Sequence, residues 1–166
     1  MRLPLTLACL LIATTAHAGV DGPLPENNPE ALRIIEASAA TCADEGAGDL
    51  TVGEGAYTAA DLDLDGAEDD LVLDFDYIQC QFNAAQWGGT GGTPKWFVLD
   101  GRASIEVWGG AWQTIDVQPW VDDPGHTERL ILVPVHGGNC DGYGAQPCWR
   151  VLATFEGQFS TLPVPE

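Results

Sequence analysis

The sequence has 166 residues, 45% of them hydrophobic, and a formal net charge of −19, because 25 Asp and Glu residues face only six Lys and Arg residues. This charge excludes an ordinary nucleic-acid-binding protein, which needs basic contacts with phosphate, and it disfavours an anionic membrane surface for the same reason. Cations, basic proteins, glycans and other neutral ligands remain as partners. Such acidity is also typical of proteins that stay soluble in salty media.

The first 18 residues predict a secretory signal peptide. A positive start at Arg2 precedes a mostly apolar run at 3–12, and the tripeptide A-H-A at 16–18 is a small-x-small cleavage site. The apolar run is too short for a membrane span, and no later segment is apolar enough for one. We therefore expect cleavage after Ala18 and a periplasmic or secreted protein.

Residues 19–166 have the length of one domain. We expect an extended leader at 19–27 and a single disulfide-bonded, β-rich domain at 28–166. An even number of cysteines in an exported chain predicts two disulfides among Cys42, Cys80, Cys140 and Cys148, with three pairings open. We favour Cys42–Cys80 and Cys140–Cys148, which would stabilise the fold by about 4 and about 2.5 kcal/mol in the loop-entropy model. A zinc site is disfavoured because no C-x-x-C pair occurs.

One helix is predicted near the start of this domain. Asn28 has the character of an N-cap, and Pro29 and an acid follow it in the first turn. An apolar face recurs at helical spacing, and two glycines then end the helix. The face comprises Leu32, Ile35, Ala39 and Cys42, and the glycines are Gly46 and Gly48.

The rest of the chain reads as β-structure, with D-G, G-G and E-G dipeptides at the connections. Candidate strands are 50–52, 56–59, 70–75, 95–99, 104–108, 112–117, 129–135, 149–154 and 158–162. Cys80 follows the apolar run at 71–73 at the same distance at which Cys140 follows the apolar run at 131–133. This similarity suggests an internal repeat. The predicted fold is thus mainly β, with antiparallel sheets in a sandwich-like or propeller-blade-like arrangement, two similar units and one N-terminal helix.

The stretch D-L-D-L-D-G-A-E-D-D at 61–70 has the spacing of a calcium loop. Calcium takes six to eight oxygen ligands, and carboxylates at every second residue before a glycine supply them. Asp61, Asp63 and Asp65 occupy positions 1, 3 and 5, the carbonyl of Ala67 is at position 7, and Asp69 is at position 9. Glu68 and Asp70 fall outside this spacing.

The stretch is not an EF-hand, because position 12 is Val72 instead of a bidentate glutamate and the following residues are strand-like. It resembles instead the calcium loop of FG-GAP and VCBS-type repeats, which lies between two strands of a propeller blade. The resemblance implies Asp61, Asp63, Asp65 and Asp69 as side-chain ligands and Ala67 as a carbonyl ligand. It covers about fifteen residues and departs from the family at Leu64, where glycine is frequent. The chain is too short for a seven-bladed propeller.

The wider layout is similar to that of small, uncharacterised exported bacterial proteins: a helix with a cysteine, an aspartate loop, strands and a glycine-rich loop. That resemblance implies no activity.

The alternative for the acidic stretch is a metal-free turn on an acidic protein, since charge runs are usually solvated. Magnesium fits less well than calcium because it prefers few carboxylates and several waters. We therefore expect an exported calcium-binding β domain with a structural or interaction role.

Two other functions remain open. The first is a carbohydrate- or surface-binding module that uses a face of exposed aromatic residues, the candidates being Trp87, Trp108, Trp112 and Trp120. Trp96 and Trp149 lie in apolar strands and are expected in the core. The second is a hydrolase, which is least favoured because the sequence has no catalytic motif and, with 25 acids, any carboxylate pair is uninformative.

Overall fold

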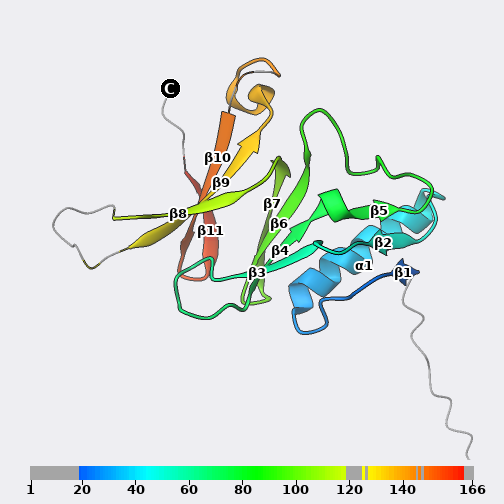
Figure 1. Cartoon of the computed structure of the whole chain (residues 1–166), viewed down its shortest axis with the longest axis horizontal. Coiled ribbons are helices and arrows are strands. Elements are labelled where there is room, and N and C mark those ends of the chain that lie inside the picture. Colours follow the sequence, from blue (N-terminus) through cyan, green and yellow to red (C-terminus); the bar gives the residue numbers. More distant parts are fainter. Residues whose placement is uncertain (1–18, 119–124, 126, 145, 147, 163–166) are drawn as a thin grey trace, which may run out of the picture.

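The computed structural model describes residues 19–118, 125, 127–144, 146 and 148–162. The predicted signal peptide at 1–18 and the candidate Trp120 lie outside this part of the chain. In the described residues the fold is mainly β, with three sheets and one α-helix (Figure 1). No helix in the described ranges combines the length and the hydropathy that a membrane span requires.

Helix α1 spans Pro29–Asp44 and begins as the sequence predicts. The side chain of Asn28 accepts a hydrogen bond from the amide of Ala31 at 2.9 Å, which caps the first turn. The carboxylate of Glu30 accepts two hydrogen bonds from the Arg33 side chain and a third, at 2.6 Å, from the Ser104 hydroxyl. The third bond fastens the helix to the neighbouring sheet.

Two of the sheets have the same topology. Each is a four-stranded antiparallel sheet whose strands lie side by side in their order along the chain, with a short 3-10 helix between the second strand and the third. In the middle sheet, a short strand of the third sheet also lies between the second strand and the third. This shared order supports the internal repeat. The middle sheet comprises β3 (Tyr57–Ala60), β4 (Asp70–Asp74), β6 (Thr93–Leu99) and β7 (Ala103–Gly109), and its 3-10 helix is η1 (Phe75–Tyr77). The outer sheet comprises β8 (Gln113–Val117), β9 (Glu128–Val135), β10 (Cys148–Phe155) and β11 (Gln158–Leu162), and its 3-10 helix is η2 (Gly137–Cys140).

A small third sheet lies beside α1. Its strands are β1 (Val20–Asp21), β2 (Leu50–Val52) and β5 (Ile78–Cys80), in the order β1-β2-β5, with β1 parallel to β2. The sequence analysis missed β1 and β5 because each has only two or three residues and forms by pairing with distant β2.

The middle sheet is buried on both faces, which makes the molecule three-layered. Successive residues of a strand point to opposite faces. Val72 accordingly joins the apolar cluster between the two large sheets, whereas Leu73 joins the cluster against α1 and the small sheet. Phe97 and Val98 divide in the same way. Figure 1 shows the middle sheet between the outer sheet on one side and the helix with the small sheet on the other.

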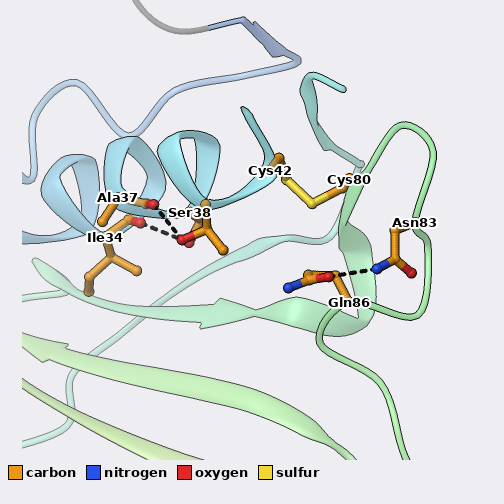
Figure 2. Close-up of a disulfide and its surroundings, with 8 residues drawn as sticks. Ile34, Ala37, Ser38, Cys42, Cys80, Asn83 and Gln86 are labelled. Carbon is orange, nitrogen blue, oxygen red and sulfur yellow. Dashed lines mark hydrogen bonds between the residues drawn. A yellow bond between two sulfur atoms is a disulfide. The ribbon is translucent and has the colours of Figure 1, made fainter. Parts of the chain in front are cut away.

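Two disulfides form with the predicted pairing. Cys42, at the end of the buried helix face, bonds to Cys80 of β5 with a Cα–Cα distance of 5.5 Å (Figure 2). Cys140 bonds to Cys148 with a Cα–Cα distance of 6.3 Å, which closes the loop between η2 and β10. The first bridge ties α1 to the small sheet across 38 residues of sequence, and the second ties the end of η2 to the start of β10.

Two sequence predictions about burial are wrong. Leu32 is only half-buried, because the helix turns Ala31, Ile34 and Ile35 towards the core instead. Trp149 is 40% exposed, since it alternates along β10 with the inward-facing Cys148 and thus points away from the neighbouring sheet.

Lys95 is the only lysine in the sequence, and it is fully buried in β6. Its ammonium donates hydrogen bonds to a carboxylate oxygen of Asp74, to Asp76 at 2.8 Å and to the hydroxyl of Thr93 at 2.7 Å. Burial alone would raise the pKa of Asp76, but the hydrogen bonds from Lys95 and Thr93 outweigh it and hold the pKa below its ordinary value. The buried charge is thus fully hydrogen-bonded, as a buried ammonium must be.

Candidate metal centre

The acidic loop at 61–69 connects β3 to β4, two antiparallel neighbours whose last pair is Ala60 with Asp70. Leu62 anchors the loop because its side chain is fully buried between the two large sheets. Asp70 anchors it at the other end. This carboxylate is buried and accepts hydrogen bonds from the amide of Leu62 at 2.7 Å and from the amide of Asp100 at 3.0 Å.

Alternating aspartates shape the loop between these anchors. The side chain of Asp63 accepts a hydrogen bond from the amide of Asp65 at 3.2 Å, and the side chain of Asp65 accepts one from the amide of Ala67 at 2.8 Å. A hydrogen bond that an aspartate side chain accepts from the amide two residues further on forms an Asx turn. Leu64 and Gly66, the residues between each aspartate and the amide that it binds, have the positive φ values of 64° and 90°. Leu64 is the position where FG-GAP and VCBS-type loops often have glycine, which such a φ explains.

Six carboxylates converge around the loop in two groups of three. Each group offers one oxygen per residue, and the oxygens within a group all lie within 4.8 Å of one another. Calcium binds oxygen at about 2.3–2.6 Å, so ligands on opposite sides of one ion stand roughly 5 Å apart, and each group fits that span. The inner group is Asp61, Asp63 and Asp70, and the outer group is Asp65, Asp69 and Asp100.

Asp61 carries the clearest sign of a missing counter-charge. Its Oδ1 atom is buried and has no hydrogen-bond partner among the described residues, whereas buried polar atoms are nearly always paired. Its backbone carbonyl accepts a hydrogen bond from the guanidinium of Arg129, which also binds both carboxylate oxygens of Asp116. Arg129 therefore holds the loop from the outer sheet and leaves the Asp61 side chain for another partner.

The electrostatics of the loop disfavour its negative charge. Burial raises the pKa of the Asp63 carboxyl above its ordinary value, and repulsion from Asp65, Asp100 and Asp61 adds to the shift against one opposing hydrogen bond. Burial likewise raises the pKa of Asp70, although its two amide hydrogen bonds oppose the shift. A bound cation would reverse both effects, because an opposite charge within a few ångströms favours the ionised form.

The structure divides the predicted ligands. Asp61 and Asp63 lie in the inner group, Asp65 and Asp69 lie in the outer group, and Ala67 takes part through the amide that binds Asp65.

Sequence reasoning missed two residues at this site. Asp70 was set aside because it falls outside the loop spacing, yet it holds the loop together. Asp100 lies thirty residues further on, in the turn between β6 and β7, and reaches the loop because β4 pairs with β6. The D-G dipeptide at 100–101 marks that turn, but only the strand pairing brings it to the loop.

The three candidate tryptophans that the structure describes do not form one face. Trp87 packs edge-to-face on Phe75, with ring centroids 5.3 Å apart, and Trp112 packs the same way on Phe97 at 5.7 Å. These contacts place them in different layers of the core. Trp108 is 42% exposed on β7.

Comparison with known proteins gives no match: no protein-family model, no curated protein and no solved structure matches the chain.

Proposed function

We propose that the chain is an exported domain whose loop at 61–70 binds one calcium ion, and that this ion has a structural role. The side-chain ligands are Asp61, Asp63, Asp65 and Asp69, and the carbonyl of Ala67 is a further ligand. The observation that carries the proposal is the buried and unpaired oxygen of Asp61, which lies within one of the two groups of three carboxylates around the loop.

The chemistry of the donor set favours calcium over other metals. All of the converging side chains are aspartates, and hard oxygen ligands in this number suit calcium. Magnesium keeps several waters and takes few carboxylates. Zinc prefers nitrogen and sulfur ligands, and the four described cysteines are engaged in disulfides. Those disulfides also suit an oxidising, exported location.

The position of the loop supports a structural role. Leu62 anchors it between the two large sheets, and Arg129 reaches it from the outer sheet. Asp70 joins it to the β6–β7 turn, where the carbonyl of Gly101 accepts a hydrogen bond from the amide of Glu30 in α1. An ion in the loop would therefore stabilise a point where all three layers meet.

The resemblance to FG-GAP and VCBS-type loops is a second support. In that family the loop lies between two strands of one blade, and here it connects neighbouring strands of a four-stranded antiparallel sheet.

Calorimetric titration with calcium tests the proposal. We expect one ion per chain. Asp63→Asn keeps the acceptor for the Asp65 amide but removes the charge, and it should weaken calcium binding by about ten-fold or more, the typical cost of losing a charged contact. Glu68→Gln is the matched control, because Glu68 is an exposed acid of the same loop outside both carboxylate groups. Equal affinities for Asp63→Asn and wild type would reject the ligand set, and no heat of binding for wild type would reject the proposal.

A further inference from the structure

A second feature of the molecule, separate from the acidic loop, is a groove of about 430 Å³ beside strand β7. Its walls come from both large sheets, since residues of β7, β9, β10 and β11 line it together with Asn139 of η2. This volume lies within the range of about 300–1,000 Å³ that is typical of small-molecule sites.

Trp108 supplies an aromatic side chain to the lining of this groove. The side chain is 42% exposed, and its indole Nε1 donates a hydrogen bond to Oε1 of Glu106 at 3.1 Å. The two residues are two apart on one strand and therefore share a face. This hydrogen bond satisfies the N–H and restrains the indole, and the exposed part of the ring is apolar surface that a ligand could cover.

Hydrogen-bond donors and acceptors line the same groove. Glu106 is an acceptor, Arg150 offers only donors, and Asn139 and Thr161 offer both. Among the residues that the structure describes, the guanidinium of Arg150 forms no ion pair. The lining thus combines one positive and one negative side chain, in contrast to the strongly negative chain as a whole.

This combination favours a neutral polyhydroxyl ligand. A sugar ring has an apolar C–H face that stacks on an indole and hydroxyls that need donors and acceptors at its edge. Polyanions are repelled by the net charge of −19. A cationic ligand would be repelled within the groove by the guanidinium of Arg150.

We propose that the groove beside β7 binds a neutral oligosaccharide, with one sugar ring stacked on Trp108 and its hydroxyls held by Glu106, Asn139 and Arg150. The site binds the sugar without cleaving it. Glycoside hydrolysis generally uses two carboxylates on either side of the scissile bond, and Glu106 is the only carboxylate that the described residues contribute to the lining.

Titration with neutral sugars tests this site. Cellohexaose, xylohexaose and maltohexaose would each be added to about 10 mM in buffer with calcium, and binding followed by tryptophan fluorescence and calorimetry. We expect saturable binding of at least one sugar. Trp108→Ala should weaken it by about ten-fold or more, as loss of a buried aromatic contact typically does.

Trp149→Ala is the matched control. Trp149 is 40% exposed, nearly as much as Trp108, but it does not line the groove; its removal should leave the affinity unchanged within about two-fold. Asn139→Ala, at an exposed position, is a second variant in case Trp108→Ala does not fold, and it should weaken binding by about three-fold, as loss of one hydrogen bond does.

Three results would overturn the inference. The first is no saturable binding of any of the three sugars. The second is an equal loss of affinity in Trp108→Ala and Trp149→Ala. The third is stronger binding of an oligogalacturonate than of the neutral sugars, which would make the ligand anionic. Release of reducing ends from a bound sugar would overturn the claim that the site does not cleave it.

Discussion

Replacing Lys95 by methionine is expected to lower the free energy of unfolding by about 3 kcal/mol. Methionine keeps most of the buried chain but removes the ammonium, so the carboxylate of Asp74, whose side chain is only 19% exposed, loses its charged partner. Removing one partner of a buried ion pair costs roughly 3–5 kcal/mol. The lower end applies because Asp76 is 53% exposed and is screened by water. For a domain of this size the melting temperature should fall by roughly 6–12 °C.

Thermal and urea unfolding with the disulfides intact would measure this change. The control is Lys95→Met combined with Asp74→Asn, which removes both charges and should recover roughly half of the lost stability, since the two residues are in direct contact. Labelling of amines offers a second readout. Lys95 is the only lysine and is fully buried, so the native protein should react there only through unfolding. Wild-type stability in Lys95→Met, or no recovery in the double variant, would refute the reasoning.

Three further changes have definite expected outcomes. Replacing Cys42 and Cys80 by alanine should lower the unfolding free energy by about 4 kcal/mol, because a constraint on 38 residues is lost; an unchanged urea midpoint would contradict this. The hydrogen bond from Arg33 lowers the pKa of Glu30 from its ordinary value of 4.5 to about 2. A lowered carboxyl pKa stabilises the fold above the ordinary value, and this stability is lost as the pH falls from 4.5 towards 2. Wild type should therefore lose more stability over that interval than Glu30→Gln, and parallel acid-unfolding curves would speak against it. Leu64→Asn should raise the free energy of unfolding by roughly 1 kcal/mol, because Leu64 has a φ of 64° that asparagine tolerates better. A lower melting midpoint in this variant would argue against strain at Leu64.

Much of the fold could be predicted because its signals are local. Asn28 and Pro29 mark the start of α1, and short apolar runs between glycine-containing turns mark most strands of the two large sheets. The cysteine pairing was also predicted, because Cys42 ends the buried helix face and Cys140 and Cys148 are separated by only eight residues. By contrast, β5 depends on its register with β2, where Leu50 lies opposite Cys80, and three residues contain too little periodicity to reveal it.

The sequence indicates the aspartates of the loop itself but not Asp70 and Asp100, which lie beside it in the structure. The spacing of the aspartates selects Asp61, Asp63, Asp65 and Asp69, but the roles of the surrounding residues depend on long-range pairing. Asp100 enters through the β6–β7 turn. The groove at Trp108 is likewise a product of two sheets meeting, and nothing in the strand at 104–108 alone distinguishes this tryptophan from those that pack in the core.

A melting curve in calcium against one in EDTA tests the central claim most directly. If the ion binds the native loop alone, a calcium concentration about 100-fold above Kd should stabilise wild type by about 2.7 kcal/mol, which corresponds to roughly 5–11 °C for a domain of this size. The same shift should persist in Glu68→Gln and be strongly reduced in Asp63→Asn, and magnesium should give a smaller shift. Identical midpoints for wild type in calcium and in EDTA would contradict a structural calcium ion in the loop.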